Sequence, residues 1–267
     1  MQSSRLKNII ILILALVNIF LLGSLSVRKN AQLETRRQVQ EQLVALFSAS
    51  DLTLDPKAVS FQTPPSGGTL TRDADQERQL AAALLGKGLS HSSQSGVIYS
   101  YESDAGAAVF SAGGSFDAAV LLENGTDAER FCRKICKQFQ YDSFTAANEY
   151  GQFTAGAVRS FDSYPVPNCT ISFALQGDTL TVSGTFLPSA FSAAGEEEPL
   201  SAAAALTAFL GSHRESGAVV SAVTDMYPCY TVQSTSAAAM TLTPTWCICT
   251  DFGLYYVNCY TGAVTRG

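Results

Sequence analysis

The sequence is poor in charged side chains, and in basic side chains above all. Only 15% of its 267 residues are charged, and 17 lysines and arginines face 23 aspartates and glutamates, which leaves a net charge of −6. A protein that binds nucleic acid needs clustered lysine and arginine side chains to neutralise phosphates. The composition therefore argues against a nucleic-acid partner.

Histidine is almost absent, and this restricts the chemistry of a thiol enzyme. A nucleophilic cysteine needs a base within hydrogen-bond reach, and the only histidines are His91 and His213. Each follows a predicted helix that ends at glycine, so we expect both in solvated loops. The sequence also lacks a P-loop, an HExxH pattern and a nucleophile elbow. We therefore predict no catalytic residue and no cofactor, in a globular protein that acts by binding.

The N-terminus contains a long uncharged apolar run, NIIILILALVNIFLLGSLSV, at residues 8–27. As a helix that rises about 1.5 Å per residue, this run spans the hydrocarbon core of a bilayer. We predict a single-pass anchor in the cell membrane, with residues 1–7 cytoplasmic and the C-terminal domain extracellular. Basic residues flank both ends, so they do not fix the orientation by themselves. The alternative is a cleaved signal peptide, although the apolar core of a signal is usually only about 7 to 15 residues long.

Asn18 lies near the middle of this apolar run. An amide at that depth often forms a hydrogen bond with a neighbouring helix. Ala15, Leu22 and Ser26 share its helix face at spacings of three and four residues. We predict that this face contacts a membrane partner. The alternative is that Asn18 is hydrogen-bonded to the backbone of its own helix.

Residues 28–50 are predicted to form a juxtamembrane helix. Apolar residues recur in it at helical intervals, namely Leu33, Val39, Leu43, Leu46 and Phe47. Such a helix could be a stalk or a coiled-coil arm, and the stretch is too short to decide between them. The segment TPPSGG, residues 63–68, breaks any helix and is the best candidate for a linker.

Two later parts of the chain follow the same order of elements. Residues 72–86 and 196–211 are each predicted to be an alanine- and leucine-rich helix that ends at glycine, and each is followed by a Ser-Gly step into a β-rich run. We therefore predict two duplicated α+β modules, residues 51–150 and 151–267. The expected fold class is α+β, with antiparallel sheets and a few helices.

Two hairpins and one more helix are predicted between these parts. The hairpins turn at Gly113-Gly114 and at Gly177-Asp178, each between two apolar runs. The helix begins after Thr126 or Asp127 and carries an apolar stripe. Cys132 and Cys136 lie four residues apart on it, so we predict a buried structural pair.

Three of the seven cysteines lie in the closing stretch WCICTDFGLYYVNCYTGAV. We predict a hairpin with a three-residue loop, in which Asp251 and Phe252 form a type I turn and Gly253 is a left-handed bulge residue. That register would pair Cys249 with Tyr255 and Cys247 with Val257. The thiols that it would place on one face are those of Cys247, Cys249 and Cys259.

Three thiols on one face resemble part of a tetrahedral zinc site, with Cys229 as a fourth ligand. The spacing C-x-C does not match the C-x-x-C of zinc knuckles or of thioredoxin-like redox motifs. Free cysteine also behaves as a small buried hydrophobe. We therefore favour packing over metal binding. Because seven is odd, at least one thiol must stay free or pair with another chain if disulfides form.

The order of motifs resembles the YycI and YycH type of membrane-anchored regulatory proteins. The N-terminal part of the resemblance is a short basic start, an apolar run containing LVNIFLL and a polar helix. The C-terminal part runs from the alanine-rich helix through MYPCY and LTPTW to YYVNCYTG. The tail is also similar to that of PepSY-type modules, which are small extracytoplasmic domains. The motif residues are Pro244, Trp246, Gly253, Tyr256, Val257, Asn258, Thr261 and Gly262.

The resemblance implies an accessory protein that is anchored by one helix and tunes an essential sensor histidine kinase in the membrane of Gram-positive bacteria. It implies a second anchored accessory protein of the YycH type as a further partner, and it brings no catalytic residue. Seven cysteines are unusual for this family. The alternative is a stand-alone PepSY-like module that binds an extracytoplasmic peptide or a cell-wall component.

Overall fold

The computed structural model describes most of the chain after the apolar run. The described ranges are residues 33–149, 151–195, 197–216, 219–236 and 238–267. The predicted anchor at residues 8–27 and the predicted tail at residues 1–7 lie outside them. Within the described ranges, no helix has both the length and the apolar character needed to cross a membrane.

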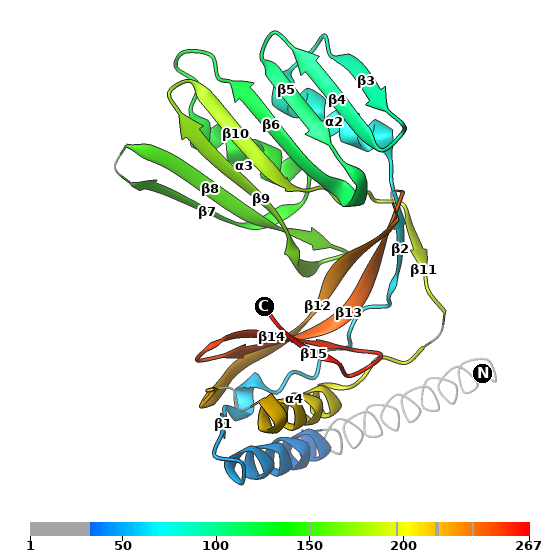
Figure 1. The fold of residues 1–267 in the computed structure, drawn as a ribbon. Helices are drawn as coiled ribbons and strands as arrows, with labels where there is room; N and C mark the ends of the chain where they lie inside the picture. The colour runs from blue at the N-terminus through cyan, green and yellow to red at the C-terminus, as the bar shows by residue number, and fades with distance from the viewer. Residues whose placement is uncertain (1–32, 150, 196, 217–218, 237) are drawn as a thin grey trace, which may run out of the picture.

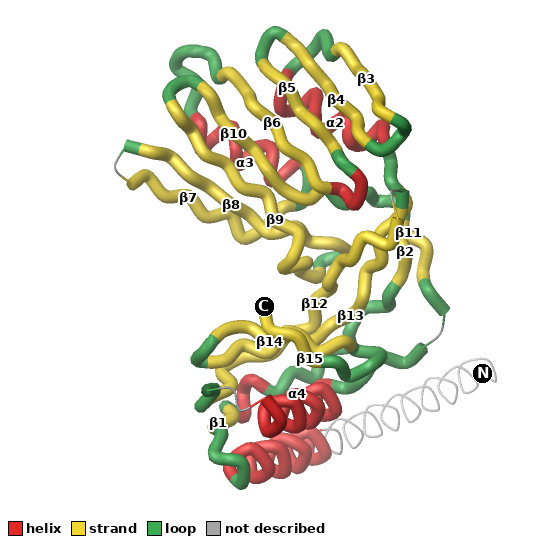
Figure 2. The backbone as a smooth tube through the Cα atoms, in the orientation of Figure 1, coloured by secondary structure: helices red, strands yellow, loops and turns green. Residues whose placement is uncertain are grey.

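The described chain forms two sheets, and helices cover one face of each (Figures 1 and 2). All strand pairs are antiparallel except β1, which is parallel to β12. The prediction of an α+β fold with antiparallel sheets and a few helices is therefore confirmed.

The larger sheet has eight strands in the order β3-β4-β5-β6-β10-β9-β8-β7. Its strands are β3 (Ser90–Gln94), β4 (Ile98–Ser103), β5 (Gly106–Phe110), β6 (Ser115–Leu121), β7 (Tyr141–Glu149), β8 (Gln152–Phe161), β9 (Tyr164–Gln176) and β10 (Thr179–Thr185). The short helix η2 (Ala112–Gly114) joins β5 to β6. Both predicted hairpins are confirmed, since β5 turns into β6 through Gly113-Gly114 and β9 turns into β10 at Gly177-Asp178.

Two helices pack on one face of this sheet. They are α2 (Ala74–Leu85) and α3 (Ala128–Gln138), and their N-caps are Asp73 and Asp127. Each N-cap carboxylate accepts hydrogen bonds from backbone N–H groups of the first turn, which stabilises the helix start. Both predicted helices are therefore confirmed. The core between helices and sheet includes Leu80, Ile135 and Phe173.

The second sheet has seven strands, five of them in the order β1-β12-β13-β14-β15, with β2 pairing to β13 and β11 to β2. Its strands are β1 (Thr53–Leu54), β2 (Gly68–Thr71), β11 (Phe191–Ala193), β12 (Ala222–Ser236), β13 (Ala239–Thr250), β14 (Gly253–Asn258) and β15 (Val264–Arg266). A helix over residues 33–48, the short helix η1 (Pro56–Ala58) and α4 (Ala202–Ser216) lie beside it (Figure 1). Its core combines Phe47, Phe209 and Trp246.

The boundary between the two sheets does not lie at residue 150, where the two predicted modules meet. Strands β3 to β10 form the larger sheet, whereas β1 and β2 join β11 to β15 in the other. The larger sheet is thus inserted into the unit of the smaller one. The chain crosses between them at residues 72–73 and again at residues 186–190. The segment 63–68, predicted to be a linker, instead leads into β2.

The end predicted for the alanine-rich helix at Gly211 is wrong, because α4 continues to Ser216. A glycine inside a helix costs about 1 kcal/mol relative to alanine. Burial of Phe209 and Leu210 just before it offsets this cost.

Candidate functional site

The closing hairpin differs from its predicted register by one residue. Thr250 pairs with Gly253, Cys249 with Leu254 and Cys247 with Tyr256, without a bulge. Gly253 does have a positive φ of 127°, as predicted for this position. The loop therefore consists of Asp251 and Phe252 alone. The predicted pairs of Cys249 with Tyr255 and of Cys247 with Val257 are wrong.

The shifted register separates the three cysteines. Cys259 belongs to the core that faces α4, together with Trp246 and Val257. Cys247 and Cys249 lie on the opposite face. The predicted cluster of three thiols on one face is therefore wrong.

A tyrosine flanks the thiols on this second face from each neighbouring strand. Tyr227 of β12 and Tyr256 of β14 both pair with Cys247 in the central strand β13. Cys229 lies two residues after Tyr227 in β12, on the same face, and is fully buried. The face thus presents partly exposed tyrosines above buried thiols.

Burial keeps these thiols in the neutral form. Desolvation raises the pKa of Cys247 and of Cys259 to about 12, and it also raises the pKa of Cys249. On the larger sheet, burial raises the pKa of Cys132 to about 12 and that of Cys136 to about 11. A thiolate, not a thiol, is the nucleophile and the metal ligand. The environment of these cysteines therefore disfavours thiol chemistry at neutral pH.

The described residues hold no group of three or more histidine, cysteine or acidic side chains with the geometry to bind a metal ion. All seven cysteines lie in described ranges, and none is in a disulfide. Cys132 and Cys136 of α3 are both buried between this helix and the larger sheet, as predicted.

The two histidines do not lie in loops, so that prediction is wrong. His91 is in strand β3, where its ring stacks on Tyr99 at 5.6 Å between ring centroids. His213 is in the last turns of α4, where its ring stacks on Phe209. The local sequences look like loops because they are rich in serine and glycine, but pairing with β4 and continuation of α4 override that preference.

The C-terminal motif residues have structural roles. Trp246 is fully buried, and its indole Nε1 donates a 2.8 Å hydrogen bond to the carbonyl of Leu200, just before α4. Pro244 lies where β13 changes partner, since residues 239–242 pair with β2 and residues 245–250 pair with β14. A proline fits there because it has no N–H to donate.

Asn258 organises the turn that follows β14. Its Oδ1 accepts hydrogen bonds from the N–H groups of Tyr260 at 2.8 Å and Thr261 at 3.1 Å. Gly262 then adopts a positive φ of 70°, and its N–H donates to the carbonyl of Asn258. The Y-V-N-x-x-T-G step is therefore a turn that directs β15 back onto β14.

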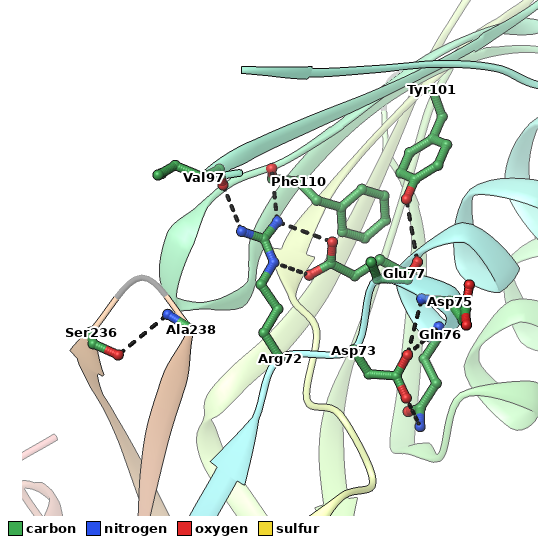
Figure 3. A network of polar contacts seen from close by, with 11 residues as sticks. Arg72, Asp73, Asp75, Gln76, Glu77, Val97, Tyr101, Phe110, Ser236 and Ala238 are labelled. Atoms are coloured by element: carbon green, nitrogen blue, oxygen red, sulfur yellow. Dashed lines mark hydrogen bonds and ion pairs between the residues drawn. The ribbon is translucent and has the colours of Figure 1, made fainter. Parts of the chain in front are cut away.

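A polar network that the sequence did not reveal lies where β2 leads into α2 (Figure 3). The Arg72 guanidinium makes a bidentate ion pair with Glu77, with distances of 2.7 Å from Nε to Oε1 and 3.0 Å from Nη2 to Oε2. Arg72 also donates to the carbonyls of Val97 and Phe110. Both charged side chains are more than nine-tenths buried. No local pattern marks this pair, because Glu77 looks like an ordinary first-turn acidic residue.

Hydrogen bonds also link the two segments in which the chain crosses between the sheets, residues 72–73 and residues 186–190. Gln76 of α2 receives a hydrogen bond from the N–H of Ser189 at 3.0 Å and donates one to the hydroxyl of Ser189. The backbone N–H of Arg72 donates to the carbonyl of Ala238, next to the β12–β13 turn. Both passages of the chain between the sheets are therefore fixed by hydrogen bonds.

An apolar cluster also joins the two sheets. It contains Leu70 and Leu242 from the seven-stranded sheet together with Val166 and Cys169 from β9. The Asn168 side chain pairs with the backbone of Val232, donating at 2.7 Å and accepting at 3.0 Å. The contacts at this junction give the two sheets a defined relative position.

The predicted partner-binding face of the anchor lies outside the described residues. Its members are Ala15, Asn18, Leu22 and Ser26. The first described helix follows it closely in sequence, beginning at residue 33.

Comparison with known proteins shows a likeness in fold. No family model matches the chain, and no curated protein matches it. An uncharacterised protein from Eubacterium rectale is similar in structure, with a TM-score of 0.51 and 11% identity over 81% of this chain and 90% of that chain. The C-terminal domain of YpeB from Bacillus megaterium aligns with a TM-score of 0.35 and 12% identity over 74% of this chain and 98% of that chain. The first likeness shows the fold alone, and the second is too low to support an inference.

Proposed function

We propose that this protein is a membrane-anchored accessory protein of the YycI type, whose extracellular domain binds a sensor histidine kinase and modulates its activity. The observation that carries the proposal is the way in which helix 33–48 is built into the core of the domain. This helix follows the apolar run at residues 8–27 after a few residues only.

The second half of the helix is fixed to the domain, whereas residues 33–38 are exposed. Phe47 is fully buried and stacks on Phe209 of α4, with ring centroids 6.4 Å apart. Leu43, one turn earlier, is also buried in the same core. The Gln40 side chain donates a 2.8 Å hydrogen bond to the carbonyl of Pro56 in η1. A displacement of this helix would therefore disturb the core that it shares with α4.

We propose that these contacts make the helix a part of the domain, not a free stalk or a coiled-coil arm. A free stalk or a coiled-coil arm would present its apolar stripe to solvent or to another helix. Here Val39, Leu43 and Phe47 face the domain of their own chain, whereas Leu33 and Leu46 of the predicted stripe are exposed. The helix is suited to couple an anchor to the domain, as a regulator of a membrane protein requires.

Regulation by binding requires that the protein contact the two signalling states of the kinase differently. We propose that the anchor face around Asn18 packs against the membrane helices of the kinase, while the rigidly attached domain contacts its extracellular part. A second anchored accessory protein of the YycH type is the further partner that the motif resemblance implies.

The experiment replaces Asn18 by leucine in the full chain and measures co-purification of the kinase from detergent-solubilised membranes. We expect less kinase to be recovered, because leucine cannot form the interhelical hydrogen bond. Phe20→Leu is the matched control, because the predicted helix would place residue 20 on the side opposite Asn18 and the same residue type is introduced. Unchanged recovery with Asn18→Leu would contradict the role of this face.

A further inference from the structure

The two edges of the eight-stranded sheet differ in their protection against further strand pairing. At one edge, β7 has an irregularity between Asp142 and Thr145, and Ser143 within it has a positive φ of 54°. The acidic residues Asp142 and Glu149 flank this strand edge. Bulges and charged side chains are the usual devices that keep an edge strand from pairing with another chain. The β7 edge is therefore protected.

The opposite edge, formed by β3, has none of these devices. Its sequence is SHSSQ, without a charged residue or a proline, and all five residues are exposed. It pairs with β4 in continuous register from Ser90 to Gln94. In the described part of the chain, β4 is its only strand neighbour. An edge strand of this kind presents N–H and C=O groups that only another extended backbone can pair in full.

We propose that β3 is a self-association edge, through which two copies of this protein pair in antiparallel fashion about a two-fold axis at Ser92. In that register Ser92 faces Ser92 of the second copy and His91 faces Ser93. Ser90 then faces Gln94. The two eight-stranded sheets would join into one continuous sheet.

The side chains of β3 favour a second copy as the occupant. Two-fold pairing places each side chain opposite one from the same five-residue segment, so a charged residue at the centre would face its own like charge. Like charges directly opposite each other destabilise a strand pair. β3 contains no aspartate, glutamate, lysine or arginine, and its serine and glutamine side chains can both donate and accept hydrogen bonds.

His91 is already held in place for such a contact. Its ring lies 5.6 Å from that of Tyr99 and 5.2 Å from that of Tyr101, between ring centroids. Tyr101 is in turn fixed by a hydrogen bond from its hydroxyl to the carbonyl of Ala74 in α2. The imidazole therefore loses little conformational freedom when a hydroxyl group of the second copy approaches it.

The contact between the two β3 strands is short, so it should be populated mainly where the copies are confined together. Five paired residues bury much less than the roughly 800 Å² per partner of a standard stable interface. Confinement raises the effective concentration of a weak pair. The fraction of paired chains should therefore be higher in the membrane than in dilute solution. This difference rests on the proposed membrane anchor. The contact between two β3 edges does not depend on the anchor.

Cross-linking of the full chain in membrane vesicles tests the proposal. Ser92→Cys places two thiols opposite each other, and copper-phenanthroline should convert them to a disulfide-linked dimer in several-fold greater yield than in the unaltered protein. Ala147→Cys on the exposed β7 edge is the matched control, and we expect it to give only background. Equal yields from both edges, no dimer from Ser92→Cys, or a cross-link from Ser92→Cys to another protein would overturn the proposal.

A second variant tests the pairing without an added cysteine. Ser92→Lys places like charges opposite each other, so the dimer fraction of the full chain in membrane vesicles should fall several-fold, as measured by resonance energy transfer between two fluorescently tagged copies. Ser92→Thr keeps the position neutral and should preserve the dimer. Residue 92 is exposed, so neither change should disturb the fold. A dimer fraction that is the same in both variants would contradict the pairing. Loss of the anchor would lower the dimer yield in vesicles for every variant alike and is thereby distinguished from loss of the edge contact.

Discussion

At the scale of single residues, Trp246 shows how a sequence motif acts through one hydrogen bond and one buried ring. The indole joins β13 to the carbonyl of Leu200 and fills the core beneath α4. The motif was recognisable in the sequence, and so was its position in a strand. Its partner was not, because Leu200 lies 46 residues away and no local pattern connects the two.

Replacing Trp246 by phenylalanine should lower the free energy of unfolding by about 2 to 4 kcal/mol. The change leaves the buried carbonyl of Leu200 without its donor, which costs about 1 to 3 kcal/mol, and it also leaves space unfilled. Chemical denaturation of the purified protein measures the difference. Phe252→Leu, at an exposed loop position, is the control and should have little effect.

The buried thiols should make the free energy of unfolding depend on pH in the alkaline range. Desolvation raises the pKa of Cys132 to about 12 and that of Cys136 to about 11, whereas a thiol in the unfolded chain ionises near its ordinary pKa of 9.0. The folded state therefore holds protons that the unfolded state loses. Below pH 9 these thiols leave stability unchanged, and between about pH 9 and 12 they make it fall as pH rises.

Denaturation at pH 7.5, 8.5 and 10 in the presence of a reductant measures this effect. Tyrosines ionise in the same range, so the thiol contribution is the difference between the unaltered protein and the Cys132→Ala, Cys136→Ala double variant. The variant should lose less stability between pH 8.5 and pH 10. A parallel loss in both proteins would show that these two thiols do not contribute.

At the scale of elements, the closing hairpin shows what turn chemistry predicts and what it misses. The sequence placed a glycine with positive φ at residue 253 correctly. The register was wrong by one residue, because the Asp251 carboxylate accepts hydrogen bonds from the N–H groups of Ser221 and Ala222 at the start of β12. A contact across 30 residues thus sets a loop length that local rules assign differently.

The packing of helix 33–48 should contribute strongly to the stability of the domain. Phe47→Ala should lower the free energy of unfolding by about 3 to 5 kcal/mol, because it removes a fully buried ring from the core shared with α4. Leu46→Ala is the matched control, since that neighbouring side chain is 38% exposed. Denaturant titration compares the two variants. Similar small effects in both would show that the helix is not fixed to the domain.

At the scale of the whole molecule, the sequence predicted the fold class but not the arrangement of the two sheets. Antiparallel hairpins and helix starts depend on residues that are close in sequence, so most of them can be predicted from local patterns. The insertion of one sheet into the unit of the other depends on the pairing of β2 with β13, which joins Leu70 to Met240. Pairing over such a separation leaves no signal in either segment alone, so division of the chain into consecutive modules was the simpler prediction.

The junction between the sheets should be sensitive to loss of its buried ion pair. Removing one partner from a buried pair leaves an uncompensated charge and costs about 3 to 5 kcal/mol, so Glu77→Ala should destabilise the protein strongly. Glu129→Ala is the control, because it breaks the exposed pair with Arg133 and should cost less than about 1 kcal/mol. Thermal unfolding of both variants measures the contrast. Equal losses would contradict the role given to the buried network.

We propose above that the protein regulates a sensor histidine kinase by binding it in the membrane. The most direct measurement reconstitutes the full chain in nanodiscs with the kinase that co-purifies with it and follows kinase autophosphorylation. The rate should change when the chain is present; Asn18→Leu should reduce the change, and Phe20→Leu should preserve it. An autophosphorylation rate that is the same with and without the unaltered chain, at concentrations where both are incorporated, would contradict regulation of the kinase by this protein.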